Sequence, residues 1–221
     1  MITILLTSYN RPRLIRRTLA ALLAQTNPNW RCILLDDNSN LATLKKIATF
    51  KDERIQLVQH KTTPGERATT VRYSALINSV LPTLTEGIVG YLCDNVEYGP
   101  QLVETVEQFF AENPGIFAGY VLHQRDVWTD DGLSRLGTAS QYGHWDYTPP
   151  NELPMIAPLG LLDHSQVFHR LPVELAWPED PQYVASGDGS FFTELVGAYG
   201  PIYPMRPGLP LTFEHLLESK V

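Results

Sequence analysis

Two segments near the start of the chain, residues 4–12 and 33–40, each run from a short apolar stretch directly into a polar turn. Both apolar stretches read Ile-Leu-Leu, which favours strands buried in a sheet. The polar side chains that follow are Tyr9, Asn10, Asp36 and Asp37. Ligands of open α/β sheets bind at the carboxyl ends of the strands. The two segments therefore predict a ligand site at one edge of a sheet.

Strand-like and helix-like segments alternate through the first half of the chain. Apolar spacing predicts helices over residues 12–25, 41–50, 66–81 and 102–110, and strands over residues 31–36, 55–59 and 88–93. Strands separated by helices need crossover connections, so the sheet is expected to be mostly parallel and wound in one hand. No Ser/Gly linker or low-complexity tract divides the sequence. These features predict a single α/β domain over residues 1–221.

Composition limits the classes of partner. With 24 acidic and 17 basic residues the formal net charge is -7, which argues against broad binding to nucleic acid or anionic membranes. No apolar run approaches the roughly 20 residues of a membrane span, and residues 2–6 are too short for a signal-peptide core. Cys32 and Cys93 fall in predicted buried strands, where packing is commoner than a disulfide or a metal site. We expect a soluble, cytoplasmic protein.

Acidic residues stand at several of the predicted strand ends. They are Asp36 with Asp37, Asp94 with Glu97 close by, Asp163 and Asp188. One aspartate alone is most often a helix N-cap or turn former, but several on one rim indicate a site. Arg67 and Arg72 lie near the start of the third predicted helix. Together with Tyr9, these side chains can hold a base, a ribose and a diphosphate.

Six motifs occur in a fixed order: residues 7–11, 36–39, 66–73, 91–95, 162–170 and 187–192. The first four resemble the nucleotide-sugar half of family 2 glycosyltransferases of the GT-A fold, in particular those of spore-coat polysaccharide synthesis. The last two resemble acceptor-side segments of the same enzymes. The resemblance implies a Rossmann-like sheet flanked by helices. It also implies a nucleotide-sugar-binding half over about residues 1–100 and an acceptor-binding half over about residues 101–221.

The resemblance implies roles for individual side chains. The nucleotide-binding set is Thr7, Tyr9, Asp37, Arg67, Arg72 and Asp94. Asp37 is expected to pair with a donor N–H of the nucleobase, which favours a UDP or TDP sugar as donor. Asp188 is the expected general base, which removes the proton of an acceptor hydroxyl while the nucleoside diphosphate leaves and configuration inverts. The implied partners are this donor and a glycan or other hydroxyl acceptor.

A divalent cation, Mn²⁺ or Mg²⁺, is the cofactor that the resemblance implies. Its expected ligands are Asp94 and the following residue, where the family has a second carboxylate and this chain has Asn95. An amide offers only a neutral carbonyl oxygen, although hard cations accept such ligands. Either Asp94 and Asn95 hold the cation, helped by Glu97, or a histidine, Arg67 or Arg72 neutralises the leaving diphosphate.

Trp145 and His164 are the expected acceptor-binding residues. Trp145 lies in an aromatic and polar stretch suited to stacking on a sugar, although a tryptophan packed in a core would show the same sequence. His164 and His169 flank a short apolar strand, where the odd interval predicts rings on opposite faces. A helix is expected over residues 190–196, and a solvated terminal helix around His215.

Two other functions stay open. A relative that has lost catalysis would still bind nucleotide or glycan, and Asn95 motivates this alternative. A nucleotidyltransferase would need a glycine-rich, lysine-bearing loop after the first strand, and residues 7–12 offer none. The sequence also lacks a Walker-type Gly-Lys-Ser/Thr loop and a Gly-x-Gly-x-x-Gly turn, so kinase and nicotinamide-dependent functions lose their main support.

Overall fold

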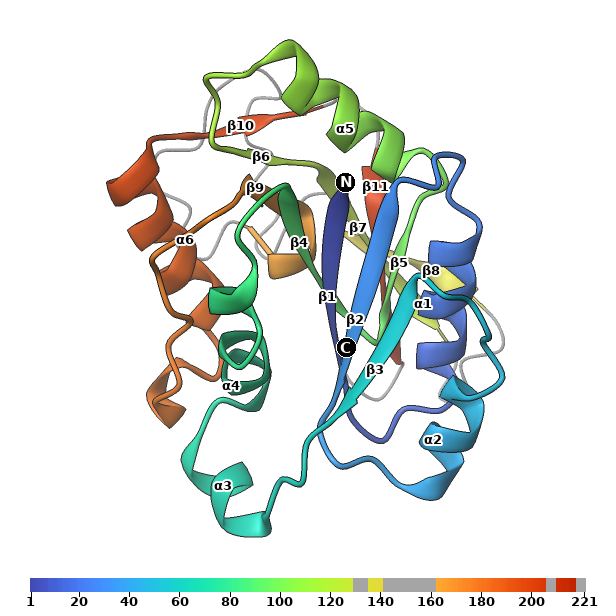
Figure 1. The fold of residues 1–221 in the computed structure, drawn as a ribbon. Coiled ribbons are helices and arrows are strands. Elements are labelled where there is room, and N and C mark those ends of the chain that lie inside the picture. Colours follow the sequence, from blue (N-terminus) through green and yellow to red (C-terminus); the bar gives the residue numbers. More distant parts are fainter. Residues whose placement is uncertain (129–134, 141–161, 206–209, 218–221) are drawn as a thin grey trace.

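A seven-stranded sheet forms the centre of the protein (Figure 1). The computed structural model describes residues 1–128, 135–140, 162–205 and 210–217. The strand order is β10-β6-β9-β4-β1-β2-β3. The strands span Ile2–Ser8 (β1), Trp30–Asp36 (β2), Ile55–Gln59 (β3), Ile88–Cys93 (β4), Ala118–Tyr120 (β6), Val167–Arg170 (β9) and Ile202–Pro204 (β10). All run in one direction except β9, which is antiparallel to β4 and β6.

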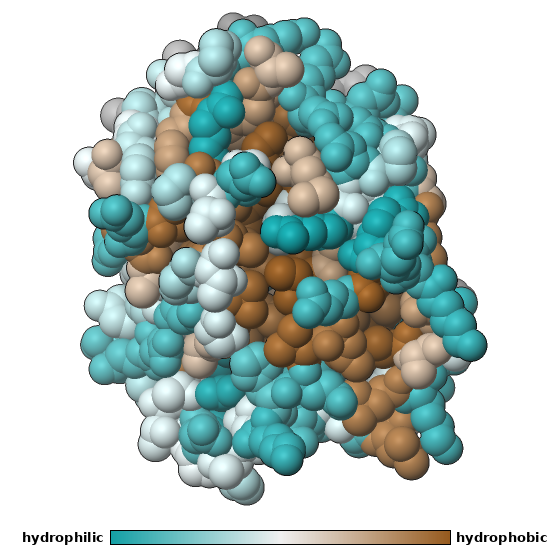
Figure 2. Space-filling model, in the orientation of Figure 1, coloured by the Kyte–Doolittle hydropathy of each residue, from teal (hydrophilic) through white to brown (hydrophobic). Residues whose placement is uncertain are grey.

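Helices cover both faces of this sheet. The helices span Leu14–Leu23 (α1), Leu41–Ile47 (α2), Pro64–Thr69 (α3), Arg72–Asn78 (α4), Leu102–Glu112 (α5) and Gly187–Tyr199 (α6), and of these α3 has no buried side chain. Successive side chains of β1 point to opposite faces: Ile4 and Leu6 pack in the core that α1 and α5 share, and Leu5 packs with α4 and α6. Hydrophobic side chains also reach the surface between α4 and β3 (Figure 2), where Leu57 is 40% exposed.

A smaller four-stranded sheet has the order β5-β11-β7-β8. Its strands span Val96–Tyr98 (β5), Leu122–Trp128 (β7), Arg135–Ser140 (β8) and Pro210–Leu217 (β11). β11 pairs antiparallel with β5 and parallel with β7. Because β5 follows β4 after a turn of two residues, Asp94 and Asn95, the second sheet begins at the strand-end edge of the first.

The helix expected over residues 66–81 is two helices in the structure. Thr70 has an extended backbone, with φ of -138° and ψ of 148°, which ends α3. The Val71 amide donates to the Glu179 carbonyl at 2.8 Å, so a distant segment fixes the break. As a result Arg67 lies on α3 and Arg72 opens α4.

The carboxyl-terminal prediction was wrong. His215 lies in β11, is only 4% exposed, and does not belong to a solvated helix. The helix expected over residues 190–196 is the middle of α6, so Asp188 lies within its first turn. The strands expected over residues 55–59 and 88–93 have the predicted bounds. Among the helices of the described residues, none is long and apolar enough to cross a membrane.

Candidate functional site

A pocket of about 280 Å³ opens at the carboxyl ends of β1 and β4. Its walls include all of the residues expected to bind a nucleotide: Thr7, Tyr9, Asp37, Arg67, Arg72 and Asp94. Arg11 and Tyr73, which were not among the predicted site residues, line it as well, and so does Cys93, which was expected to be a packing residue. Four of the motifs that are separate in the sequence therefore line one pocket.

Two asparagines shape the turns after β1 and β2. Asn10 and Asn38 adopt left-handed backbone conformations, with φ of 53° and 61°, which asparagine tolerates better than most residues. Asn10 Oδ1 accepts a hydrogen bond from the Asn40 amide at 2.7 Å, and Ser39 Oγ accepts one from the Asn10 amide at 3.0 Å. These bonds tie the two turns together, so side chains from both line one pocket.

Asp37 is the most heavily bonded carboxylate of the pocket. Its Oδ1 accepts from Arg72 Nε at 3.1 Å and Nη2 at 3.0 Å, and from the Thr62 hydroxyl. Its Oδ2 accepts from Arg67 Nη1 at 2.5 Å, and Arg67 Nη2 donates to the Asp37 carbonyl at 2.8 Å. The break between α3 and α4 brings the two arginines to the same carboxylate. Oδ2, with one donor against three at Oδ1, keeps capacity for another.

Asp94 is buried beneath the turn that follows β1. Its Oδ2 accepts from Ser8 Oγ at 3.1 Å and from the Tyr9 amide at 3.0 Å, and its Oδ1 accepts from Arg11 Nη1 at 3.0 Å. Burial raises the pKa of Asp94 above its usual range, and the opposing effects of Arg11, the Tyr9 amide and Ser8 do not offset it. Both oxygens of Asp94 are therefore engaged by protein donors.

Asn95 is directed toward the smaller sheet. Its Nδ2 donates to Glu214 Oε1 at 3.2 Å, and its carbonyl accepts from the His215 amide at 2.8 Å. Glu97, the other expected helper, contacts Arg17 Nε at 2.8 Å and His215 Nε2 at 2.6 Å. Neither Asn95 nor Glu97 is among the described residues that line the pocket.

These contacts decide whether Asp94 and Asn95 fit a divalent cation. A cation bound there would meet the positive charge of the Arg11 guanidinium, which donates to Asp94 Oδ1, and the Asn95 amide, whose Nδ2 donates to Glu214, supplies no negative charge. Hard cations need several oxygen ligands with open lone pairs. The two residues, as the structure places them, do not fit a divalent cation.

A second cluster lies beside the pocket. Asp163, His164 and Asp188 offer ligand atoms that all lie within 4.8 Å of one another, and among the described residues they form the one group that could hold a metal ion. His164 Nδ1 lies 3.7 Å from Asp163 Oδ1, and its Nε2 lies 2.9 Å from Cys93 Sγ. Burial lowers the pKa of His164, but Cys93 and Asp163 raise it more, to about 10. A protonated imidazole therefore balances the carboxylates of this cluster.

Tyr73 connects this cluster to the pocket. Its ring stacks on the His164 ring with centroids 5.7 Å apart, and it also lines the pocket. A Cβ placed on Gly187 would lie 2.4 Å from Tyr73 Oη. Glycine at 187 therefore lets the first turn of α6 approach Tyr73. That approach brings Asp188, whose Oδ1 accepts from the Gly189 amide at 2.8 Å, to the edge of the site.

The two histidines do not point to opposite faces of one strand. Residue 164 belongs to the short helix His164–Gln166 (η2), so the alternation of a strand does not apply across the interval. His164 contacts Cys93 and His169 contacts Tyr91 of the same strand, β4, at positions two apart. His169 is buried, and its Nδ1 donates to its neighbour's carbonyl, that of Arg170, at 2.8 Å.

The outcome for three further residues, Trp145, Cys93 and Arg11, differs from one to the next. Trp145, expected at the acceptor wall, lies outside the described residues. Both cysteines are free, as expected, but only Cys32 is fully buried, because Cys93 borders the pocket. Arg11 was not predicted as a site residue, although its position in the same turn as Tyr9 could have indicated it.

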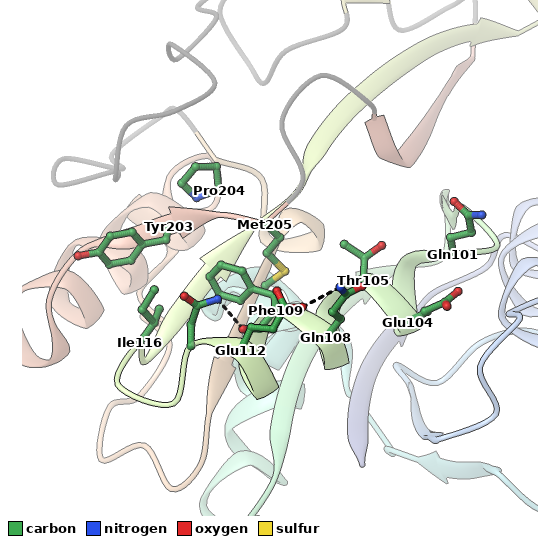
Figure 3. Close-up of a pocket in the computed structure, with 11 residues that line it drawn as sticks. Gln101, Glu104, Thr105, Gln108, Phe109, Glu112, Ile116, Tyr203, Pro204 and Met205 are labelled. Carbon is green, nitrogen blue, oxygen red and sulfur yellow. Dashed lines mark hydrogen bonds between the residues drawn. The ribbon is translucent and has the colours of Figure 1, made fainter.

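A larger cavity, of about 700 Å³, lies elsewhere (Figure 3). α5 contributes Glu104 and Glu112 to its wall, and Tyr203 and Met205 come from β10 and the residue that follows it. Its described lining contains carboxylates and no arginine or lysine. This cavity does not suit a diphosphate, so the strand-end pocket is the candidate site.

Comparison with known proteins indicates the family that the chain resembles. Residues 3–70 match the model of the family described as glycosyl transferase family 2. Protein CgeD of Bacillus subtilis (strain 168) is 28% identical over 222 residues, covering 96% of this chain and 50% of that protein. The UDP-Glc:alpha-D-GlcNAc-diphosphoundecaprenol beta-1,3-glucosyltransferase WfgD of Escherichia coli is 32% identical over 78 residues, covering 34% of this chain and 31% of that protein. The chain thus spans at most half of these relatives.

Two solved structures show the same fold. S. aureus TarS 1-349 in complex with UDP has a TM-score of 0.68 at 14% identity, covering 97% of this chain and 60% of that one. The mannosyltransferase PcManGT from Pyrobaculum calidifontis, in complex with GDP-Man and Mn²⁺, has a TM-score of 0.62 at 15% identity, covering 96% of this chain and 56% of that one. The predicted GT-A fold and the resemblance to family 2 glycosyltransferases are confirmed. The predicted enzyme class is the one that the matching family describes.

Proposed function

We propose that this chain, with its GT-A fold and its match to glycosyl transferase family 2 over residues 3–70, transfers a sugar from a nucleoside diphosphate to a hydroxyl acceptor. The observation that carries the proposal is the pocket in which Asp37 and Asp94 stand among three arginines. Such a pocket suits a ligand that is both hydrogen-bonding and anionic. The UDP in the TarS structure and the UDP-Glc in the WfgD name support this donor class.

Asp37 is proposed to recognise the nucleobase of the donor. Its Oδ2 retains acceptor capacity and is buried in a protein wall, so it suits the ring N–H of uracil or thymine. Tyr9 supplies a flat, partly exposed ring beside it. These two features favour a UDP or TDP sugar over an ADP sugar, because adenine has no ring N–H donor on its exposed edge.

The ribose and the diphosphate are proposed to lie between Asp94 and the arginines. Thr7 and Asp94 come from the ends of β1 and β4, and Arg72 faces them from α4. Guanidinium groups bind phosphate oxygens through paired N–H donors and stay charged at any physiological pH. A divalent cation at Asp94 and Asn95 is not part of the proposal, because Asp94 is paired with Arg11 and the Asn95 amide donates to Glu214.

The proposed reaction is a single displacement. The acceptor oxygen loses its proton to the Asp188 carboxylate and forms a bond to the anomeric carbon. The bond from that carbon to the diphosphate oxygen breaks at the same time, and the nucleoside diphosphate leaves with the electron pair. Attack from the side opposite the leaving group inverts the configuration. The place of Asp188 beside Tyr73, at the edge of the pocket, supports its role as base.

The two halves of the chain take different parts in this proposal. Residues 1–100 carry the donor pocket, and residues 101–221 supply Asp163, His164 and Asp188 on the acceptor side. His164, together with Trp145, is proposed to contact the acceptor, a glycan or another hydroxyl compound. A nucleotide-binding protein without turnover is the second candidate, and Asn95, bound to Glu214 outside the pocket, favours it.

Release of nucleoside diphosphate from a panel of UDP, TDP, GDP and ADP sugars, with mixed glycan and alcohol acceptors, tests the proposal. The parent should turn over one pyrimidine donor at least about 10²-fold faster than Asp188→Asn, the usual effect of a general base. Binding of a pyrimidine nucleotide without turnover of any donor would reject the enzyme in favour of the second candidate.

A further inference from the structure

We infer that Arg11 takes the place of a divalent cation in this site, so that a guanidinium group joins Asp94 to the diphosphate of the donor. The inference rests on the proposed function, since it concerns how that donor is held. It follows from four features: the contact between Arg11 and Asp94, the direction of Asn95, the charge of the pocket, and the separate position of the other cluster.

Arg11 and Asp94 form an ion pair at the floor of the pocket. The distance from Arg11 Nη1 to Asp94 Oδ1 is 3.0 Å, and the Asp94 side chain is 5% exposed while that of Arg11 is 39% exposed. One end of the guanidinium thus contacts the buried carboxylate, and the remainder reaches the open part of the pocket. A guanidinium has five N–H donors in a planar fork, so one group can bond a carboxylate and a phosphate oxygen together.

Asn95 is adapted to a neighbour other than a cation. Its amide nitrogen donates to Glu214 Oε1 at 3.2 Å, and Glu214 Oε2 lies 2.8 Å from Arg125 Nε. An aspartate at position 95 would place a second carboxylate against Glu214, and close like charges repel. The amide therefore fits the β11 side chain beside it, and a carboxylate ligand at this position would not.

The pocket already carries positive charge for an anionic ligand. Its described lining has three guanidinium groups, those of Arg11, Arg67 and Arg72, against the carboxylates of Asp37 and Asp94. Arg67 and Arg72 both contact Asp37, which leaves Arg11 as the cation at the Asp94 end. A diphosphate that lies across Asp94 therefore meets a fixed positive charge without a metal ion.

Asp163, His164 and Asp188 do not replace this arrangement. A cation among them would contact the proposed base, and none of the three residues is among the described residues that line the pocket with Asp94. Cation binding at that cluster is a separate event, and a His164→Gln variant distinguishes it from binding at Asp94.

Calorimetric titration with UDP and TDP, in excess EDTA and in excess Mn²⁺, tests the inference. The parent should bind one of them in EDTA with a Kd within about 3-fold of its value in Mn²⁺. Arg11→Gln should weaken that binding by at least about 10-fold, the effect of losing a charged hydrogen bond. Arg11→Lys should recover part of the affinity, and Arg16→Gln, which removes an exposed arginine of α1, should match the parent.

Different failures have different meanings. Binding that tightens 10-fold or more with Mn²⁺ and keeps this gain in His164→Gln, or an Arg11→Gln variant that is folded by circular dichroism and binds like the parent, would overturn the inference and leave the proposed function intact. No binding of either nucleotide by the parent in either buffer would instead remove the proposed function, and the inference with it.

Discussion

The guanidinium carbon of Arg67 lies 3.6 Å from the centroid of the Tyr9 ring. A cation over an aromatic face is attracted by the ring quadrupole, and the same guanidinium bonds Asp37. Residues from the turn after β1, the turn after β2 and α3 are thus fixed to one another. This linkage explains how a site assembled from three distant segments keeps one shape before a ligand arrives.

Asp37 gives the first prediction. Asp37→Ala should weaken binding of the preferred nucleotide by about 1–3 kcal/mol, because a buried polar partner is lost. It should also lower the free energy of unfolding, since Arg67 and Arg72 lose their shared carboxylate. Titration calorimetry and urea unfolding measure the two effects. Asp52→Ala, which breaks a carboxylate–arginine pair outside the pocket, should leave nucleotide affinity unchanged. Equal affinity of Asp37→Ala and parent removes Asp37 from the donor site.

Asp188 gives the second prediction. Asp188→Asn should lower kcat by at least about 10²-fold and leave the nucleotide Kd within about 2-fold of the parent, because Asp188 is not among the described lining residues of the donor pocket. Steady-state kinetics and calorimetry measure these quantities. The matched control is Asp180→Asn, a carboxylate that caps the short helix Pro181–Tyr183. A kcat equal to that of the control contradicts the assignment.

Two glycines of α6 form a matched pair. Gly187→Ala should destabilise the protein by about 1–3 kcal/mol and reduce turnover, because its Cβ meets Tyr73 Oη at 2.4 Å. At Gly197 a Cβ has no neighbour within 4 Å. Gly197→Ala should therefore stabilise the helix by about 0.5–1 kcal/mol. Thermal unfolding and donor turnover of both variants test the close approach of α6. Similar effects of the two substitutions would contradict it.

His169 predicts a pH dependence of stability. Burial lowers its pKa from 6.5 to about 4 in the folded protein, with the hydrogen bond to the Arg170 carbonyl opposing. The unfolded chain therefore binds more protons between these values, and the free energy of unfolding falls as pH falls from about 6.5 to 4. The expected loss is about 3 kcal/mol.

Urea unfolding of parent and His169→Gln at pH 7 and pH 4.5 isolates this contribution. Carboxylates affect both proteins alike, so the variant should lose less stability on acidification than the parent. His60→Gln, at a partly exposed position, should behave like the parent. If His169→Gln and parent lose the same free energy of unfolding between pH 7 and pH 4.5, protonation of His169 does not cause the loss.

Local patterns predicted the donor half well, and non-local contacts explain the errors. The strand Ile88–Cys93 follows from a run of buried apolar residues. No proline or glycine marks the break at Thr70 in the sequence. The break depends on the Val71 amide, which donates to the carbonyl of Glu179, far along the chain. His215 joins a strand through pairing with β5 and β7, which a local pattern does not reveal.

The candidate site was predictable where residues follow strands directly. Tyr9, Asp37 and Asp94 lie where the strand ends placed them. The direction of Asn95 was not predictable, because Glu214 stands 119 positions away in the sequence. Arg11 could have been found from its place beside Tyr9 in the turn, but its bond to Asp94 depends on the packing of β1 against β4.

The most direct test of the account is calorimetric titration of the purified chain with UDP, TDP, GDP and ADP. We expect selective binding of a pyrimidine diphosphate, at one site per chain, that the Asp37→Ala variant weakens. Failure of all four nucleotides to bind the folded protein would contradict it, because the strand-end pocket would then hold no donor.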